Sequence, residues 1–304
     1  MKNKQKLSSR LQNNIMIIAL ICVLFFILKT PTQSSSSTIA NPQLRMTGAR
    51  LLSLGITNPV ILADLNAVLI NPASIGTGSS FFAFSNQKIM SFFNYSTLHL
   101  SMPANFSFNF EGTQFNQTVN FAFGKGSNSL EKIPRTIFKD DRIRQISNFS
   151  SGFDIYHASA GTQMFNVFGI NALALGVNTK YINQYIADNS RSAIGIDLGF
   201  IASYYMESTV IDSLHFGSSF LNVFSSPLSW EDKPDESYLP LDILFGSQIE
   251  MLDNNLSLYI NNGIGSVNFS GEYQALRNFF FRLGTDSTRH YVGTGIQIDK
   301  IAGF

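Results

Sequence analysis

Residues 47–75 read TGARLLSLGITNPVILADLNAVLINPASI, and this stretch decides the expected fold. It ends in Asn71-Pro72-Ala73 and carries one acidic residue, Asp64, seven residues before Asn71. The chain after it is a long series of short segments in which apolar residues alternate with small or polar ones. A short element rich in glycine, asparagine and proline, followed by strands, predicts a plug ahead of a β-barrel.

The amino terminus has the pattern of an export signal. Four basic residues precede residues 15–28, which form an uncharged apolar run of 14 residues. That length suits a signal peptide and is short for a membrane-spanning helix. Small residues around Ala40 predict cleavage after this position. An uncleaved anchor is the alternative, because the polar gap between Leu28 and Ala40 is long for a cleavage region.

Composition narrows the class of protein. The single cysteine, Cys22, lies inside the apolar run, so the mature chain has no disulfide, thiolate metal site or cysteine nucleophile. Charged residues make up 13% of the chain, well below the ~25% of a typical soluble domain. A net charge of +1 gives no sign of nucleic-acid binding. The low charge indicates a surface that faces something other than water.

The alternation has the period of strands. In residues 171–182, Leu173, Leu175 and Val177 share one face, and Ala174 and Gly176 share the other. A soluble β-sandwich alternates in the same way. The export signal, the scarcity of charge and the aromatic residues near expected strand ends favour an outer-membrane barrel. We therefore expect an all-β fold, a transmembrane antiparallel β-barrel of about 12–14 strands.

The predicted domains are a signal peptide (1–40), a plug segment (41–78) and a barrel (79–304). We expect the last strand to be truncated at Phe304, and the alternative is that Phe304 is a genuine terminal aromatic residue of the kind that barrel assembly recognises. Residues 79–124 can be grouped as three or four strands around Pro103. Two charged stretches are expected to be solvated loops or rim segments, with a lid or partner-docking surface as the alternative; they are residues 125–144 and residues 230–236.

Four motifs follow one another in the N-terminal stretch: Gly48-Ala49-Arg50, Leu54-Gly55, Leu62-Ala63-Asp64 and Asn71-Pro72-Ala73. Together with the later strand motifs at 175–182 and 196–199, they resemble the signature of the PorV/PorQ family of outer-membrane proteins, which is related to the FadL-type transporters. The chain departs from the family pattern where Leu65 replaces a second aspartate and where one glycine of a pair is missing.

The resemblance implies a location in the outer membrane of a Gram-negative-type bacterium, with outer-membrane lipid as a partner. It implies help in protein secretion or surface attachment of a type IX-like kind, with secretion-system components or exported proteins as partners. The alternative is FadL-like transport of fatty acids or other hydrophobic small molecules. The plug motif that it marks as the candidate site comprises Gly48, Arg50, Gly55, Asp64, Asn71, Pro72 and Ala73.

Two roles are open for the polar plug residues. Asp64 can accept hydrogen bonds from backbone amides or pair with an inward lysine or arginine, and Pro72 biases Asn71 to an extended conformation. The simpler alternative is that these residues only set the turn into the first strand.

Enzymatic activity is not expected, and neither is a cofactor or a bound metal. The histidines lie on separate expected strands with no spacing typical of metal ligands; they are His99, His157, His215 and His290. Ser213 lies near His215 in the sequence, but nearness in sequence does not establish nearness in space.

Overall fold

A computed structural model describes residues 48–55, 58–78, 82–89, 93–110, 113–139, 142–167, 169–206, 210–230, 233–263, 266–285 and 289–296. All of them belong to one compact unit, Ile39–Phe304. The expected signal peptide (1–40) and the chain end at Phe304 lie outside the described residues.

The described chain is all-β apart from three short helices, as the alternation predicts. The helices are α2 (Ala49–Ser53), η2 (Leu65–Leu69) and η3 (Pro72–Thr77). The strands are β1 (Phe82–Ile89), β2 (Phe93–Phe110), β3 (Thr113–Lys139), β4 (Arg142–Val167), β5 (Ile170–Ile186), β6 (Asn189–Tyr205), β7 (Ile211–Ser225), β8 (Leu228–Trp230), β9 (Lys233–Ser237), β10 (Asp242–Met251), β11 (Leu256–Gly263), β12 (Ser266–Leu276), β13 (Phe279–Thr285) and β14 (His290–Ile296).

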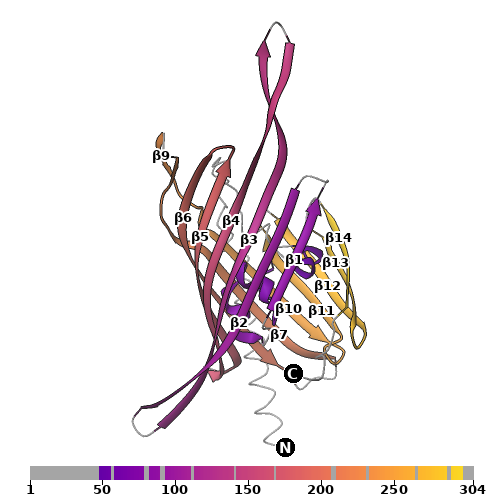
Figure 1. Cartoon of the computed structure of the whole chain (residues 1–304). Coiled ribbons are helices and arrows are strands. Elements are labelled where there is room, and N and C mark those ends of the chain that lie inside the picture. Colours follow the sequence, from indigo (N-terminus) through magenta and orange to yellow (C-terminus); the bar gives the residue numbers. More distant parts are fainter. Residues whose placement is uncertain are drawn as a thin grey trace, which may run out of the picture. The chain divides into compact units, whose positions relative to one another are not determined.

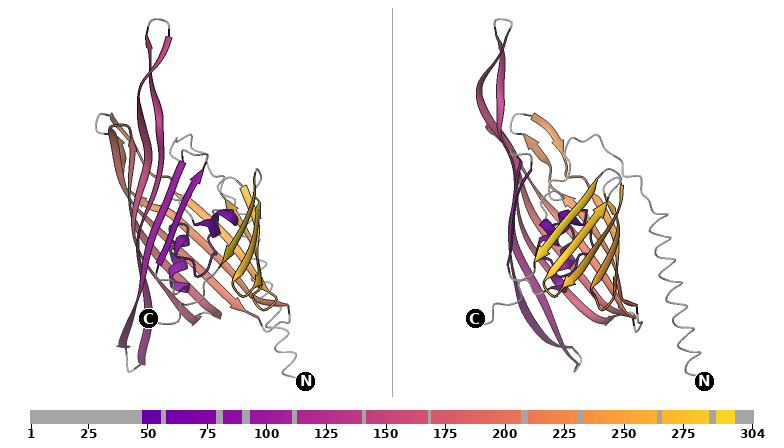
Figure 2. Two further views of the ribbon diagram at one scale, coloured as in Figure 1. Left: turned by 45° about the vertical axis from the view of Figure 1, so that its right-hand side comes forward. Right: turned by 90° about the vertical axis from the view of Figure 1, so that its right-hand side faces the viewer.

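Twelve strands form one antiparallel sheet in the order β1-β2-β3-β4-β5-β6-β7-β10-β11-β12-β13-β14, and β8 and β9 pair separately. The strand number lies within the expected range. The sheet curls so that the N-terminal segment (residues 48–78) lies on its concave side (Figures 1 and 2). Among the described residues, β1 pairs only with β2 and β14 only with β13, so these strands are the edges of the sheet.

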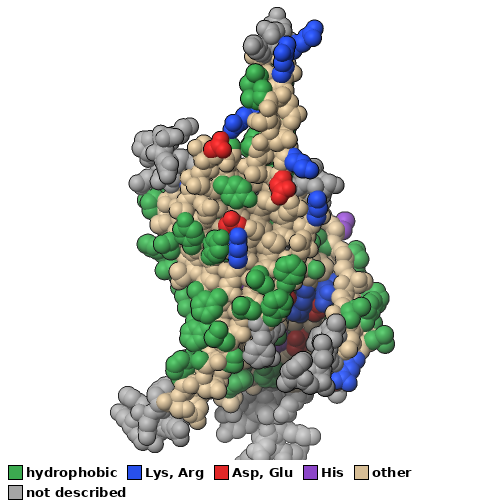
Figure 3. Space-filling model, viewed as in Figure 1, with side chains coloured by type: hydrophobic (Ala, Val, Ile, Leu, Met, Phe, Trp, Pro, Cys, Tyr) green, Lys and Arg blue, Asp and Glu red, His purple; other side chains and the backbone are tan. Residues whose placement is uncertain are grey.

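The two faces of the sheet are opposite in character. On β5, Leu175, Val177 and Tyr181 are exposed on the convex face, whereas Asn178 and Lys180 are buried on the concave face. Large apolar side chains recur over the outer surface in Figure 3. A soluble domain buries its apolar side chains and exposes its charges. In this sheet, many large apolar side chains are exposed, and polar and charged side chains are buried on the concave face. In the described part of the chain, no helix is long and apolar enough to cross a membrane.

The prediction of a solvated loop at residues 125–144 was wrong. Most of that stretch belongs to β3 and β4, which form a projecting two-stranded ribbon (Figure 1). The pairing of β3 with β2 ends at Leu130, and the pairing of β4 with β5 ends at Ser151, so beyond these residues β3 and β4 pair only with each other. We call residues 131–149 the ribbon.

Two other expectations of irregular structure also need correction. The acidic stretch at residues 230–236 is not simply a loop, because β8 and β9 form a short antiparallel pair there. Pro103 does not separate two strands but lies inside β2, opposite Asn120. On the side away from β3, Pro103 has no described strand partner, because the pairing of β2 with β1 ends at Leu100, and proline is tolerated at such an edge.

Candidate functional site

The polar residues of the predicted plug motif shape the N-terminal segment locally. Asp64 precedes η2 and accepts a hydrogen bond from the backbone N–H of Asn66 at 2.9 Å. Asn71 precedes η3 and accepts one from the N–H of Ala73 at 3.0 Å. Pro72 occupies the first helical position, where its fixed φ suits the turn and no N–H is needed. These contacts fit the simpler of the two expected roles, a tight turn.

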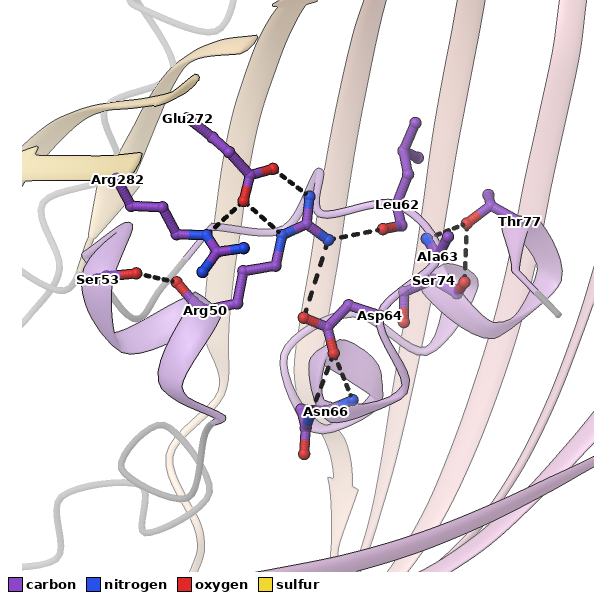
Figure 4. Close-up of polar contacts among 10 residues, drawn as sticks. All are labelled: Arg50, Ser53, Leu62, Ala63, Asp64, Asn66, Ser74, Thr77, Glu272 and Arg282. Carbon is purple, nitrogen blue, oxygen red and sulfur yellow. Dashed lines mark hydrogen bonds and ion pairs between the residues drawn. The ribbon is translucent and has the colours of Figure 1, made fainter. Parts of the chain in front are cut away.

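Arg50 gives the segment a second kind of contact, with the wall (Figure 4). Its guanidinium binds Glu272 of β12 bidentately, with Nε 3.1 Å from Oε2 and Nη2 2.8 Å from Oε1. Nη1 also donates to the Leu62 carbonyl and lies 3.9 Å from Oδ2 of Asp64. Arg282 of β13 donates to the same Glu272 carboxylate. A bidentate pair of this kind fixes orientation as well as charge.

Arg50 stays protonated in this environment. Burial lowers the pKa of its guanidinium, but Tyr259, Glu272 and Asp64 raise that pKa more, so it lies above the usual value. Arg50 therefore links three parts of the molecule as a cation: α2, the start of η2 and strand β12.

A belt of glycines lets the segment approach the wall closely. In the sheet register, Gly161 pairs with Gly176 and Gly176 with Gly199, on β4, β5 and β6. A Cβ on Gly176 would overlap the backbone of Pro72, and one on Gly199 would overlap the Asn71 side chain. Larger residues here would hold the segment away from the sheet.

The belt continues around the sheet. Gly217 of β7 pairs with Gly246 of β10, and both face Pro59. Gly284 of β13 lies against the backbone of Ser53 in α2, with 2.8 Å between its position for a Cβ and the Ser53 carbonyl oxygen. The segment is thus seated on glycines from β4 to β13.

The remaining motif residues also lie in this seat. Asn71 Nδ2 donates to the carbonyls of Pro59 (2.6 Å) and of Phe200 on β6 (3.3 Å). Gly55 has φ +89°, which favours glycine, and its carbonyl accepts from Asn268 of β12 at 3.2 Å. Gly48 and Ala73 are buried, Gly48 against Asn66. Contacts with the wall therefore bring the residues of the motif together.

Sequence reasoning missed a second polar arrangement, which we call the polar relay: His99, His157, Ser159, Asn178, Asp197 and Lys180. His99 and His157 lie on β2 and β4, on either side of Gly124 in β3. Because Gly124 has no side chain, His99 Nδ1 reaches His157 Nε2 across β3 at 2.8 Å. The period-two pattern placed each histidine on a face, but the strand register that joins them is not visible in the sequence.

The relay has a direction that its donors and acceptors determine. The Ser159 hydroxyl donates to Asn178 Oδ1 (2.7 Å), and Asn178 Nδ2 donates to Asp197 (2.8 Å). Ser159 must therefore accept from His157 Nδ1–H at 3.1 Å, which leaves His157 Nε2 to accept from His99. Every donor in the relay thus points toward the Asp197 carboxylate.

The relay ends in a buried ion pair. Lys180 Nζ lies 2.6 Å from Asp197 Oδ1, and both side chains are fully buried. The backbone N–H of Asn222 donates to the same oxygen at 2.8 Å. A buried carboxylate needs this number of partners, because its desolvation is costly.

A third cluster brings together groups typical of hydrolases. Ser213 Oγ lies 2.7 Å from His215 Nε2 and 2.5 Å from Glu250 Oε2, and Ser203 Oγ lies 2.8 Å from His215 Nδ1. Ser213 and His215, which lie near each other in the sequence, are therefore also in direct contact. Both serines and the histidine are buried, which shields the hydroxyls from a substrate in this conformation. The geometry fits a structural role, in which hydrogen bonds between side chains connect β6, β7 and β10.

Across the described residues, no group of three or more histidine, cysteine or acidic side chains is placed to hold a metal ion. Comparison of the chain with protein-family models and with curated proteins finds no match to either.

Proposed function

We propose that the chain is an exported outer-membrane β-barrel of the PorV/PorQ type, and that it assists the secretion or surface attachment of other proteins. The observation that carries the membrane part is the reversed sheet, with exposed apolar side chains outside and buried polar ones inside. Lipid solvates such an outer face, whereas water does not. In a closed barrel, β14 would meet β1 in antiparallel sense, since the sheet has an even number of strands.

The ends of the sheet suggest an orientation. Outer-membrane barrels have short periplasmic turns and longer extracellular loops. The ribbon and the connection from β7 to β10, which carries β8 and β9, extend from one end of the sheet, whereas the other end has the short turns from β4 to β5 and from β12 to β13 together with the projecting β2–β3 hairpin (Figure 1). We therefore assign the ribbon to the cell surface.

The seated N-terminal segment supports a role in protein handling over one in conduction. Glu272, the glycine belt and Asn71 hold the segment against the wall from several sides. A segment held in this way occupies the concave side of the sheet, while the ribbon offers an exposed surface to a partner protein. Ile143 and Phe138 face each other on it, and both are largely exposed.

A pull-down from outer membranes tests this function. The bait is the full chain, and the variant replaces residues 131–150 by an Asn-Gly turn that joins Leu130 to its pairing partner Ser151. Exported proteins or secretion components should be recovered with the full chain and lost with the variant. Equal recovery with both proteins would show that the ribbon is not needed for partner binding. Empty pull-downs with both proteins would contradict the proposed role in secretion or surface attachment.

One observation favours FadL-like transport as a second candidate. The surface is hollowed between β1 and the β13–β14 edge, with charged side chains deep inside (Figure 3). The side chain of Arg50, on the concave side of the sheet, is 27% exposed. Ala73 and Ala174 pack in one cluster. A thiol cross-link between Ala73→Cys and Ala174→Cys would hold the segment to β5 and should abolish uptake of a fatty acid if the segment is a gate.

A further inference from the structure

A small pocket lies where the ribbon leaves the sheet. It has a volume of about 350 Å³, and its lining includes Lys88 of β1, Asn94 of β2, and Glu131 and Lys132 of β3. Figure 3 shows basic and acidic side chains gathered on the outer surface at the base of the ribbon. The pocket is thus separate from the N-terminal segment and from the polar relay.

A β-bulge shapes this pocket. The register of β3 against β4 shifts between Leu130 and Ile133, so that Glu131 and Lys132 lie opposite the single residue Ser150. Lys132 has φ +58°, a conformation that is uncommon outside glycine and asparagine. Bulges re-aim side chains and are often found beside functional sites. Here the bulge places Lys132 in the same pocket as Lys88.

The pocket lies just beyond the apolar part of the outer surface. Along β1, the exposed residues of the outer face are Phe82, Phe84, Asn86 and Lys88, in that order. The series changes from aromatic to amide to cation over a short distance. In a membrane-inserted barrel, this sequence matches the passage from hydrocarbon to the headgroup layer.

The charges favour an anionic ligand. Within the described residues, neither Lys88 nor Lys132 forms an ion pair, although both are exposed. Two lysine ammonium groups give up to six N–H donors, which suits the oxygens of a phosphate. Glu131 is the one acidic residue of the lining and opposes an anion.

We propose that this pocket binds a phosphate group of a membrane lipid headgroup, through Lys88 and Lys132. The proposal rests on the proposed membrane insertion and adds a lipid class to it. Inorganic phosphate offers the same oxygens, but the adjoining apolar strip on β1 favours a lipid as the source.

Native mass spectrometry of the full chain in detergent provides the test, with bisphosphorylated lipid A and its dephosphorylated form as probes. We expect the phosphorylated probe to bind more tightly. Lys88→Gln and Lys132→Gln should each weaken its binding about fivefold. Glu131→Gln should strengthen its binding about twofold to fivefold, because a repulsive charge is removed.

Lys125→Gln is the matched control, since Lys125 is also on the outer face but is paired with Asp154 at 3.4 Å. It should leave lipid binding unchanged. Equal binding of both probes, or unchanged binding by both pocket variants, would overturn the proposal. The proposal would also be overturned if inorganic phosphate competed for the pocket as strongly as the lipid does.

Failure of the proposed function gives a different result. Outer-membrane fractionation and heat-modifiable gel migration report insertion alone, and recovery as a soluble periplasmic protein would overturn both proposals. Normal insertion with unaltered binding in the variants would overturn only the lipid site. Heat-modifiable migration of each variant also confirms that it has folded.

Discussion

Strand β4 runs through two regions that differ in nearly every physical respect. Residues 152–161 belong to the wall, where buried and exposed side chains alternate, and residues 142–148 belong to the ribbon, where every side chain is exposed. The backbone pairing with β3 continues through both. In the wall β4 also pairs with β5, whereas in the ribbon it pairs with β3 alone, so the two regions differ in backbone pairing as well as in side-chain burial. An isolated two-stranded ribbon is marginally stable, so we expect the wall to be the more stable region because of its second strand partner and its buried side chains.

The largest expected effect comes from the ion pair that ends the polar relay. Lys180→Ala leaves the buried carboxylate of Asp197 without its cation, and we expect a loss of about 3–5 kcal/mol in the free energy of unfolding. Urea unfolding of the protein refolded into lipid vesicles measures it. The double variant Lys180→Met with Asp197→Asn should recover part of the loss, because it removes the buried charge and keeps an acceptor oxygen for the donors that surround Asp197. If the single variant lost less than ~1 kcal/mol, the ion pair would contribute little to the stability of the wall.

Glu272→Gln should have the next largest effect. The change removes the carboxylate shared by Arg50 and Arg282 and leaves two cations close together, and we expect a loss of about 2 kcal/mol. The N-terminal segment should also become more sensitive to added protease. Glu131→Gln, an exposed acid at the base of the ribbon, is the control and should change stability by less than ~0.5 kcal/mol. Equal effects of the two substitutions would remove the distinction between wall and ribbon.

Gly199→Ala tests the close approach of the segment to the wall. The added methyl group would overlap the Asn71 side chain, so we expect a loss of about 1–2 kcal/mol and faster proteolysis of the N-terminal segment. Gly271→Ala is the matched control, because its methyl group would make an ordinary contact with Leu258 at 3.4 Å. Identical protease sensitivity of the two variants would argue against a seat formed by the glycine belt.

The fold could be predicted to the extent that it depends on local pattern. Alternation along single strands, as at Leu175 and Asn178, predicts both the strands and the division of the sheet into two faces. For Asp64 and Asn71, setting a turn was one of the two predicted roles, and the backbone N–H groups that they bind lie two positions along the chain. These contacts are short in sequence and need no knowledge of strand order.

The rest depended on strand register and on solvent exposure. His99 and His157 are 58 positions apart and meet only because Gly124 lies between them in the sheet. Arg50 and Glu272 are 222 positions apart. The ribbon was predicted as a loop because charge density indicates solvent, and a strand exposed on both faces is as charged as a loop.

The smallest expected effect comes from the ribbon itself, and strand β4 offers a matched pair to measure it. Ile143 lies in the ribbon and is 75% exposed, whereas Ile155 lies in the wall and is 0% exposed. Ile143→Ala removes little buried surface, so we expect a change in the free energy of unfolding within ~0.5 kcal/mol. Ile155→Ala should cost about 2–5 kcal/mol, because it leaves a cavity. Urea unfolding of the two variants side by side gives the comparison. A large loss for Ile143→Ala would mean that the ribbon packs against another part of the folded chain, and the ribbon would then no longer be a free surface for a partner.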